Sequence, residues 1–358
     1  MTDTATKVGT CGNEMVDAEH ITGTWMMQQT WVSMLHPFVH RLRYRHKLLL
    51  SCNALNMKTN LRFWAFMVLG VFPCALRADV SETEHGESIE ETVYKELAYV
   101  SDGHARQKLD LYLPEGKGPF PVLVWIHGGA WRAGSKDRAR GLDWLNRGVA
   151  VASVNYRLSQ HATFPAQIED CKSALRWLRA HAQTYHLDAD RFLAWGASAG
   201  GHLVALLGVT GDTRSFDVGD HLQQSSAVLA VVDEYGPTDF LQMDAMDGDS
   251  GRIVHDSADS PESQLIGGPI QEHPEKVQSA NPLTYVSKND ASFLIIHGDR
   301  DPLVAHGQSV ILHDALQHAG VEAKLYTVKG GKHGWFKDPQ VTKNIHAFIM
   351  KHLGLENL

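Results

Sequence analysis

The chain contains 358 residues, of which 43% are hydrophobic and 21% are charged. This length and composition are typical of a globular protein with one large α/β domain and additional segments. The formal net charge is −8. It argues against a nucleic-acid partner and against a basic membrane-binding surface, because both require an excess of Lys and Arg.

The first 78 residues are not expected to belong to the folded domain; their pattern indicates a segment that is removed from the mature protein. Residues 1–56 show no strong periodicity, and we interpret them as a non-native N-terminal extension. Residues 57–78 have a basic start, an apolar run and a small-residue end, which together predict a signal peptide that begins at Met57 and is cleaved after Ala78. The apolar run is shorter than the roughly 20 residues that span a bilayer, so no stable membrane insertion is expected after processing. The alternative is a membrane-proximal tail.

We therefore expect a secreted or periplasmic protein. Residues 79–91 are acidic and polar and are predicted to be a linker. The four cysteines are Cys11, Cys52, Cys74 and Cys171, and their spacing matches no zinc or disulfide framework. Cys171 alone follows the predicted cleavage site, at an apolar helical position, and is expected to pack in the core. No histidine pair stands at a metal-binding spacing with carboxylates, so neither a metal nor a cofactor is predicted.

Residues 92–358 are predicted to form the main folded domain. A strand with alternating apolar residues is expected at 108–113, and shorter apolar runs then alternate with helical patterns. Further strands are expected at 122–126, 149–154, 192–195, 227–232, 293–296 and 324–328. Helices are expected at 165–182, 306–319 and 340–353. This alternation predicts an α/β fold with a mostly parallel, doubly wound sheet and helices on both faces. Segment 239–282 breaks the rhythm and is expected to form loops and short helices over the carboxyl ends of the strands.

The sequence Gly196-x-Ser198-x-Gly200 stands between an apolar strand and an apolar helix. This is the pattern of a nucleophile elbow, a strained turn that lifts the serine hydroxyl above the sheet. A Cβ at either glycine is expected to collide with neighbouring backbone. The helix begins directly beneath Ser198, so its unpaired N–H groups and positive dipole end face the position of an oxyanion.

The sequence His-Gly-Gly-Ala-Trp at 127–131 directly follows a predicted strand. Its backbone N–H groups, with that of the residue after Ser198, are predicted to form an oxyanion hole. The predicted donors are Gly128, Gly129, Ala130 and Ala199. The alternative is an ordinary Gly-Gly turn. Trp131 either lines the acyl pocket as a substrate-binding residue or simply packs.

A serine nucleophile needs a base, and the base needs an orienting carboxylate. Asp301 follows the predicted strand 293–296, and His333 stands in a glycine-flanked loop after the strand 324–328. Their order after Ser198 is that of the α/β-hydrolase triad. Asp301 is preferred to Asp299, which is expected to brace the loop. The other histidines considered are expected to have surface or core roles; they are His202, His297, His306, His313 and His346.

From about residue 107 to residue 353 the chain resembles the α/β-hydrolase superfamily. Within it, the chain is similar to the carboxylesterases related to hormone-sensitive lipase, and most closely to the secreted group with feruloyl and acetyl-xylan esterases. The resemblance is carried by residues 127–131, 155–159, 164–170, 176–179, 196–202, 235–239, 281–282, 297–304 and 332–334.

The resemblance implies acyl transfer to Ser198, with His333 as base, on a small-molecule or carbohydrate ester of a small or short-chain acyl group. Many relatives have a third glycine where this chain has Ala130, which keeps the N–H but narrows the pocket. Ala305 replaces a common proline, a change expected to be harmless. Three further family positions are interpreted as scaffold residues: Tyr156, Arg157 and Asp170.

Other functions remain open at this point. Arylformamidases share the His-Gly-Gly-x-Trp pattern, and a peptidase could use the same three side chains, although export argues against kynurenine metabolism. A non-catalytic binding protein on a hydrolase scaffold is disfavoured because nucleophile, base and acid are all present. A long-chain lipase is disfavoured because segment 239–282 contains no strongly apolar lid.

Overall fold

The computed structural model describes residues 92–247 and 251–355. The predicted extension, signal peptide and linker lie outside the described residues. Within the described ranges, no helix is both long and apolar enough to cross a membrane.

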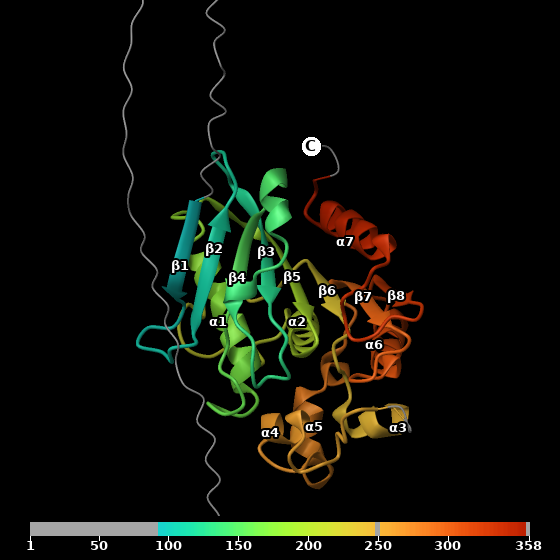
Figure 1. The fold of residues 1–358 in the computed structure, drawn as a ribbon. Coiled ribbons are helices and arrows are strands. Elements are labelled where there is room, and N and C mark those ends of the chain that lie inside the picture. Colours follow the sequence, from blue (N-terminus) through green and yellow to red (C-terminus); the bar gives the residue numbers. More distant parts are fainter. Residues whose placement is uncertain (1–91, 248–250, 356–358) are drawn as a thin grey trace, which may run out of the picture. The chain divides into compact units, whose positions relative to one another are not determined.

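An eight-stranded sheet forms the centre of the domain, in the order β1-β2-β4-β3-β5-β6-β7-β8 (Figure 1). Strands β1 and β2 pair antiparallel, β2 pairs antiparallel with β4, and the remaining pairs are parallel. The strands are β1 Thr92–Ala98, β2 Lys108–Leu113, β3 Phe120–Ile126, β4 Ala150–Val154, β5 Leu187–Ala197, β6 Ala230–Glu234, β7 Ser292–Gly298 and β8 Ala323–Val328. The predicted mostly parallel, doubly wound sheet is confirmed.

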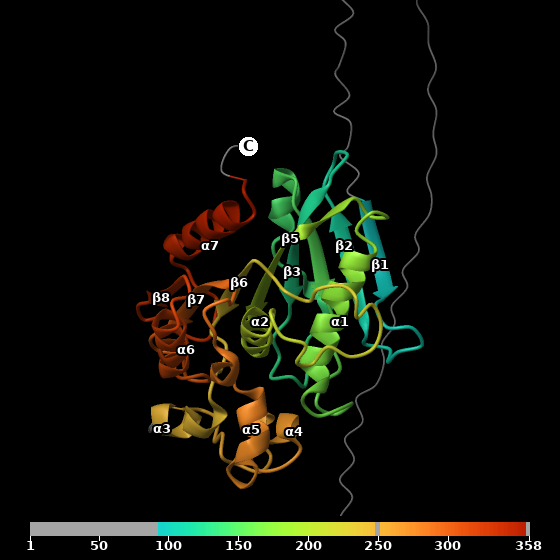
Figure 2. The same ribbon diagram turned by 180° about the vertical axis from the view of Figure 1, so that it is seen from behind.

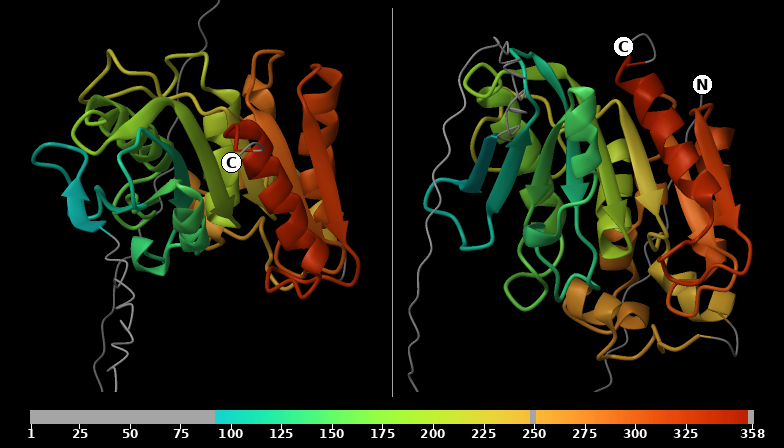
Figure 3. Two further views of the ribbon diagram at one scale, coloured as in Figure 1. Left: turned by 90° about the horizontal axis from the view of Figure 1, so that it is seen from above. Right: turned by 45° about the horizontal axis from the view of Figure 1, so that its top comes forward.

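The central strands are continuous apolar runs because both faces of the sheet are covered. Every residue of β3, β4 and β6 is buried. One face packs against α1 (Ala166–Ala180), α2 (Ala199–Val209) and α6 (His306–His318). The other packs against α7 (Pro339–His352) and the 3₁₀ helix η2 (Leu142–Arg147). Figures 2 and 3 show these two layers around the twisted sheet.

The excursion between β6 and β7 consists of short helices, as the sequence predicts. They are η3 Phe240–Gln242, α3 Met243–Asp247, α4 Pro261–Ile266, η5 Ile270–Glu272, α5 Pro274–Ala280 and η6 Pro282–Tyr285. Helices α3, α4 and α5 lie beyond the carboxyl ends of the parallel strands in both ribbon views (Figures 1 and 2). They therefore stand on the side of the sheet where α/β proteins bind ligands.

Strand β1 and several strand bounds differ from the sequence prediction; β6, for example, runs over Ala230–Glu234 rather than 227–232. Strand β1 was not predicted, because it is an almost fully exposed edge strand whose register shifts between Tyr94 and Leu97. Strand β5 begins at Leu187, five residues before the predicted run. Its first five residues are mostly polar and therefore lack the apolar pattern on which the prediction depends. Cys171 is buried in α1, as predicted.

Candidate active site

Three side chains from distant parts of the chain meet at the carboxyl ends of β5, β7 and β8. Nε2 of His333 lies 2.9 Å from Oγ of Ser198. Nδ1 of the same ring lies 2.7 Å from Oδ2 of Asp301. An ionised carboxylate only accepts hydrogen bonds, so Nδ1–H donates to Asp301 and Nε2 is left to accept the bond from the serine hydroxyl. The arrangement has the geometry of a nucleophile, a base and an orienting acid.

Ser198 is held in a strained backbone conformation at the turn from β5 into α2. Its φ is 56° and its ψ is −122°, a region that L-residues rarely occupy. A Cβ at Gly196 would run into the carbonyl of Gly200, and a Cβ at Gly200 would run into that of Ile126. Both glycines are therefore required by backbone crowding, as the sequence predicts. The Ser198 N–H donates to the carbonyl of Glu234 on β6, at 2.8 Å, which fixes the turn to the sheet.

The loop after β3 lies directly against the nucleophile. A Cβ placed on Gly128 would stand 2.6 Å from the Ala197 carbonyl oxygen and 3.2 Å from Cβ of Ser198. Gly129 has a φ of 120°, and Ala130 a φ of 53°. Only a residue without a side chain fits at Gly128, and the two residues that follow have a left-handed backbone conformation that favours glycine.

Two carbonyl groups of this loop accept hydrogen bonds from within the loop. His127 Nδ1 lies 2.8 Å from the Gly128 oxygen, and the Gly129 oxygen accepts bonds from the N–H groups of Arg132 and Ala133, both at 3.0 Å. In a trans peptide the N–H points opposite to the C=O. The N–H groups of the residues after these carbonyls, Gly129 and Ala130, therefore point away from those hydrogen bonds.

These N–H groups are available as donors. Among the described residues, neither the N–H of Gly129, nor that of Ala130, nor that of Ala199 at the start of α2 has a hydrogen-bond acceptor. Unpaired N–H groups on loops beside a nucleophile, one of them at the positive end of a helix dipole, suit an oxyanion. Burial lowers the pKa of His127 to about 4, so this ring is neutral and donates to Gly128 without adding charge.

Asp301 is held in place by several hydrogen bonds in addition to the one from His333. Asp301 Oδ1 accepts the N–H groups of Leu303 and Val304, at 2.8 and 3.1 Å. Oδ2 faces Nε2 of His297 at 3.2 Å as well as His333. Burial by itself would raise the pKa of Asp301, but the hydrogen bonds from His297 and His333 outweigh it and hold that pKa well below its usual value. The carboxylate is thus charged whenever the imidazole must be oriented.

His297 is a site residue that the sequence prediction missed. Its Nε2 lies 2.9 Å from the carbonyl oxygen of Val304, and the Ser309 hydroxyl lies 2.7 Å from its Nδ1. Because a carbonyl only accepts, Nε2 carries the hydrogen and is shared between Val304 and Asp301. Nothing in the sequence signals this role, since His297 belongs to a buried strand and its partner Ser309 to α6.

Tyr235 and Glu234 also support the site. The ring of Tyr235 meets that of His333 edge to face, with centroids 4.6 Å apart, and limits how the imidazole turns. Glu234 is buried and accepts bonds from Arg140, at 2.6 Å, and from the indole N–H of Trp195, at 3.0 Å. The negative charge of Glu234 is therefore balanced by Arg140, and both of its carboxylate oxygens already accept hydrogen bonds.

The remaining predicted positions have defined surroundings. Trp131 is buried and packs against His202 and Phe240, with centroids 5.3 and 5.4 Å apart, and its role toward substrate stays a prediction. Asp299 accepts the N–H of Gly330 at 2.6 Å, so it braces the acid loop against the histidine loop as predicted.

The three predicted scaffold residues are engaged in the frame of the site. The Tyr156 hydroxyl donates to the carbonyl of His127 at 2.9 Å. Arg157 is paired with Asp170, with Nη2 2.7 Å from Oδ1. The Tyr156 contact ties the loop after β3 to the segment after β4, and the Arg157–Asp170 pair ties that segment to α1.

Among the residues that the structure describes, one group of side chains, separate from the three residues at Ser198, could hold a metal ion. Ligand atoms of Asp244, Asp247 and His255 lie within 4.8 Å of one another. Both carboxylate oxygens of Asp244 already accept backbone N–H groups, at 2.8 Å each. His255 also stands 3.0 Å from Glu262. These contacts account for the group as a buried ion-pair cluster that ties together the excursion between β6 and β7.

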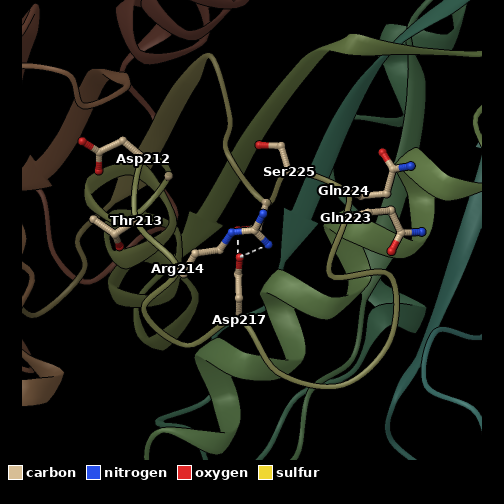
Figure 4. Close-up of a pocket in the computed structure, with 9 residues that line it drawn as sticks. Asp212, Thr213, Arg214, Asp217, Gln223, Gln224 and Ser225 are labelled. Atoms are coloured by element: carbon tan, nitrogen blue, oxygen red, sulfur yellow. Dashed lines mark hydrogen bonds and ion pairs between the residues drawn. The ribbon is translucent and has the colours of Figure 1, made fainter.

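A separate cleft of about 200 Å³ lies in the loop between α2 and β6 (Figure 4). Arg214 reaches Asp217 there at 3.9 Å. Since α2 begins at the nucleophile and runs back along the sheet, its far end and the start of β6 stand at the opposite end of the strands. The cleft therefore does not belong to the site around Ser198.

The strand order and the placement of Ser198 on the elbow define an α/β hydrolase. Residues 109–316 match the BD-FAE family. The match covers more than half of the chain, and the chain therefore belongs to the BD-FAE family. The resemblance inferred from the motifs is confirmed.

Relatives with solved structures and curated relatives agree on this class. A truncated carbohydrate esterase from gut microbiota is 34% identical, with a TM-score of 0.68, over 75% of this chain and 98% of that one. A bifunctional GH43-CE protein of Bacteroides eggerthii is 36% identical, with a TM-score of 0.67, over 73% of this chain and 38% of that one. Esterase LipC of Mycobacterium tuberculosis is 34% identical over 190 residues, which is 52% of this chain and 45% of LipC. The chain spans about half the length of the curated relatives that it matches.

Proposed function

We propose that the protein is a serine esterase that hydrolyses carboxylic esters of small or short-chain acyl groups, including esters on carbohydrate. The observation that carries the proposal is the continuous hydrogen-bonded series from Ser198 through His333 to Asp301. It stands beside unpaired N–H groups on two loops. The names of the relatives, which are esterases, support the same activity.

In this mechanism Ser198 Oγ attacks the ester carbonyl while His333 Nε2 takes the hydroxyl proton. The N–H groups of Gly129, Ala130 and Ala199 hold the oxyanion of the tetrahedral intermediate. A single such donor is worth about 2.7–4 kcal/mol of barrier. His333 then gives its proton to the leaving alkoxide, and the alcohol departs from an acyl-enzyme on Ser198.

Water completes the reaction along the same path. His333 removes a proton from the water, the hydroxide attacks the acyl carbonyl, and the proton returns to Ser198 as the acid leaves. Asp301 keeps Nδ1 protonated throughout and stabilises the imidazolium that forms twice in each cycle. His297 holds the Asp301 carboxylate in place and does not contact the reacting atoms.

The test is turnover of p-nitrophenyl acetate by Ser198→Ala. Removal of the nucleophile is expected to lower kcat by roughly 10⁴–10⁶-fold, with folding intact. Ser226→Ala is the matched control, because it removes another buried hydroxyl, which donates to Asp217 at 2.9 Å, at the opposite end of the sheet. Turnover by Ser198→Ala at the level of the control would refute the proposal.

A further inference from the structure

A second cleft opens beside His333. Its volume is about 560 Å³, and it is lined by the loop after β7, with Pro302 and Leu303, and by residues 328–338 of the loop after β8. His333 itself belongs to the lining. The cleft therefore continues from the site of ester cleavage along the carboxyl ends of the last two strands.

The charge of this cleft is opposite to that of the protein. Four cationic side chains line it, in a chain whose formal net charge is −8: Arg252, Lys329, Lys332 and Lys337. None of the four forms an ion pair with any residue that the structure describes. We call this cleft, with its four cations, the basic cleft.

Asp338 is the carboxylate in the lining of the basic cleft, and it is already engaged. Its Oδ2 accepts the hydroxyl of Tyr326 at 2.6 Å, and its Oδ1 accepts the N–H of Gln340 at 2.9 Å as the cap of α7. These bonds come from neutral donors and keep the carboxylate ionised, so four cations face one anion and the cleft has an excess of positive charge. A cleft with low-dielectric walls and an excess of one sign of charge attracts a ligand of the opposite sign.

An exposed aromatic side chain stands in the same lining. Trp335 is 97% exposed, two residues after His333. Its φ is 54°, and that of the preceding Gly334 is 76°, so two successive left-handed residues turn the indole outward. The next residue, Phe336, packs against the core instead. No residue that the structure describes covers the Trp335 indole. An exposed large apolar side chain on a strained backbone is typical of a binding position.

The chemistry of the proposed reaction indicates which part of the ester, alcohol or acyl group, lies in the basic cleft. His333 must deliver a proton to the leaving alkoxide, so the alcohol part of the ester lies next to its imidazole. The oxyanion donors come from the other two loops, after β3 and β5. A cleft lined by His333 and Trp335 therefore receives the alcohol rather than the acyl group.

We propose that the basic cleft binds a negatively charged sugar residue of the alcohol part, with the pyranose ring stacked on Trp335 and its carboxylate paired with the surrounding lysines and Arg252. The proposal rests on the proposed esterase function and narrows it to acyl esters of acidic carbohydrate, such as acetylated polyuronates. The indole supplies a flat apolar face for the C–H side of the ring. The cations supply the recognition of charge.

Binding tests the basic cleft independently of catalysis. The full chain is titrated calorimetrically with a galacturonate trimer and with the uncharged galactose trimer of the same linkage. The acidic trimer is expected to bind at least about tenfold more tightly at low salt, and the preference is expected to shrink as NaCl rises from about 0.02 M to about 0.3 M. Equal affinity for the two trimers at low salt would overturn the proposal.

Variants separate the two parts of the cleft. Trp335→Ala is expected to weaken binding of both trimers by about tenfold, and Trp335→Tyr to restore most of it. The double variant Lys329→Gln/Lys337→Gln is expected to remove most of the preference for the acidic trimer. The double variant Lys117→Gln/Lys288→Gln is the matched control, because both exposed lysines precede parallel strands at the opposite end of the sheet. Unchanged binding by Trp335→Ala, or the same loss of preference in the control, would contradict the proposal.

Activity completes the test. Release of acetate from acetylated polygalacturonate is compared with release from acetylated neutral galactan, and a preference for the acidic polymer that Lys329→Gln/Lys337→Gln reduces is expected. A wild-type protein without this preference would overturn the proposal. If the wild-type protein does not hydrolyse p-nitrophenyl acetate, the esterase function fails, while the trimer titrations still decide whether the basic cleft binds acidic sugar.

Discussion

The two turns that bring Ser198 and His333 together are held in different ways. The elbow at Ser198 is buried, and its conformation is imposed by backbone atoms that leave no room for a side chain at Gly196 or Gly200. The turn at His333 lies in a loop with exposed residues, and it is held by hydrogen bonds to Asp301 and between Asp299 and Gly330.

The difference indicates a division of labour. Steric crowding fixes the nucleophile and the oxyanion donors, where displacement by about 1 Å costs rate. Hydrogen bonds position the base while leaving the loop surface free to carry Trp335 and the lysines. A side chain added at a glycine of the elbow should therefore disturb fold and chemistry together. Changes at the exposed residues of the histidine loop should alter substrate choice before stability.

A pair of glycine substitutions should show the largest contrast. In Gly200→Ala the new Cβ would meet the backbone carbonyl oxygens of Ile126 and His127, the latter at 2.8 Å. The backbone at the elbow would have to shift, so we expect little or no folded protein. Gly330→Ala places a Cβ in open space at a φ of 69°, and is expected to cost about 1–2 kcal/mol of stability. Thermal unfolding of the purified proteins measures both. A Gly200→Ala protein that melts like Gly330→Ala would show that crowding does not hold the elbow.

A pair of carboxylate substitutions tests how the loop that contains His333 is positioned. Asp301→Asn removes the acceptor that fixes the tautomer of His333, and is expected to lower kcat/KM for p-nitrophenyl acetate by about 10³–10⁴-fold. Asp299→Asn keeps an acceptor for the Gly330 N–H and is expected to stay within about tenfold of wild type. If the two losses are equal, Asp301 is not the orienting acid.

A smaller effect is expected in the dependence of stability on pH. Asp233 is buried beneath the elbow beside Gly236, and its Oδ2 has no hydrogen-bond partner among the described residues. Burial raises the pKa of this carboxyl to about 7, whereas an unfolded Asp has a pKa of about 3.9. Between these values the folded state keeps a proton that the unfolded state has released, so this group's contribution to stability falls as pH rises.

Asp233→Asn cannot lose that proton. Its melting temperature should therefore rise relative to that of wild type between about pH 4 and pH 8, by an amount equivalent to a few kcal/mol, since one pKa unit corresponds to about 1.4 kcal/mol. Asp299→Asn, which alters an exposed carboxylate in the loop after β7, should show the same dependence of melting temperature on pH as wild type. A constant difference between Asp233→Asn and wild type across this range would contradict the expected titration.

Much of this division could be predicted from the sequence, because it depends on short local patterns. The apolar runs predict the buried parallel strands, and the glycines beside Ser198 and within 127–131 predict two backbone turns whose geometry the structure describes. Strand β1 could not be predicted, since an exposed edge strand lacks a periodic apolar face.

The missed site residues share another cause. His297 acts through Asp301 and Ser309, and these contacts exist only once β7, α6 and the acid loop pack together. The four cations of the basic cleft are likewise brought together by the fold, because Arg252 comes from a different loop than Lys329 and its neighbours. Local motifs predict the reacting atoms, whereas tertiary packing determines what surrounds them.

Covalent labelling tests the central claim most directly. The protein is treated with a fluorophosphonate, digested and analysed by mass spectrometry, beside His333→Ala. We expect a single phosphonylated residue, Ser198, in the wild-type protein, and a labelling rate reduced by orders of magnitude in the variant, because the serine then lacks its base. A label on another residue, or an unlabelled protein that still hydrolyses esters, would contradict the assignment of Ser198 as the nucleophile.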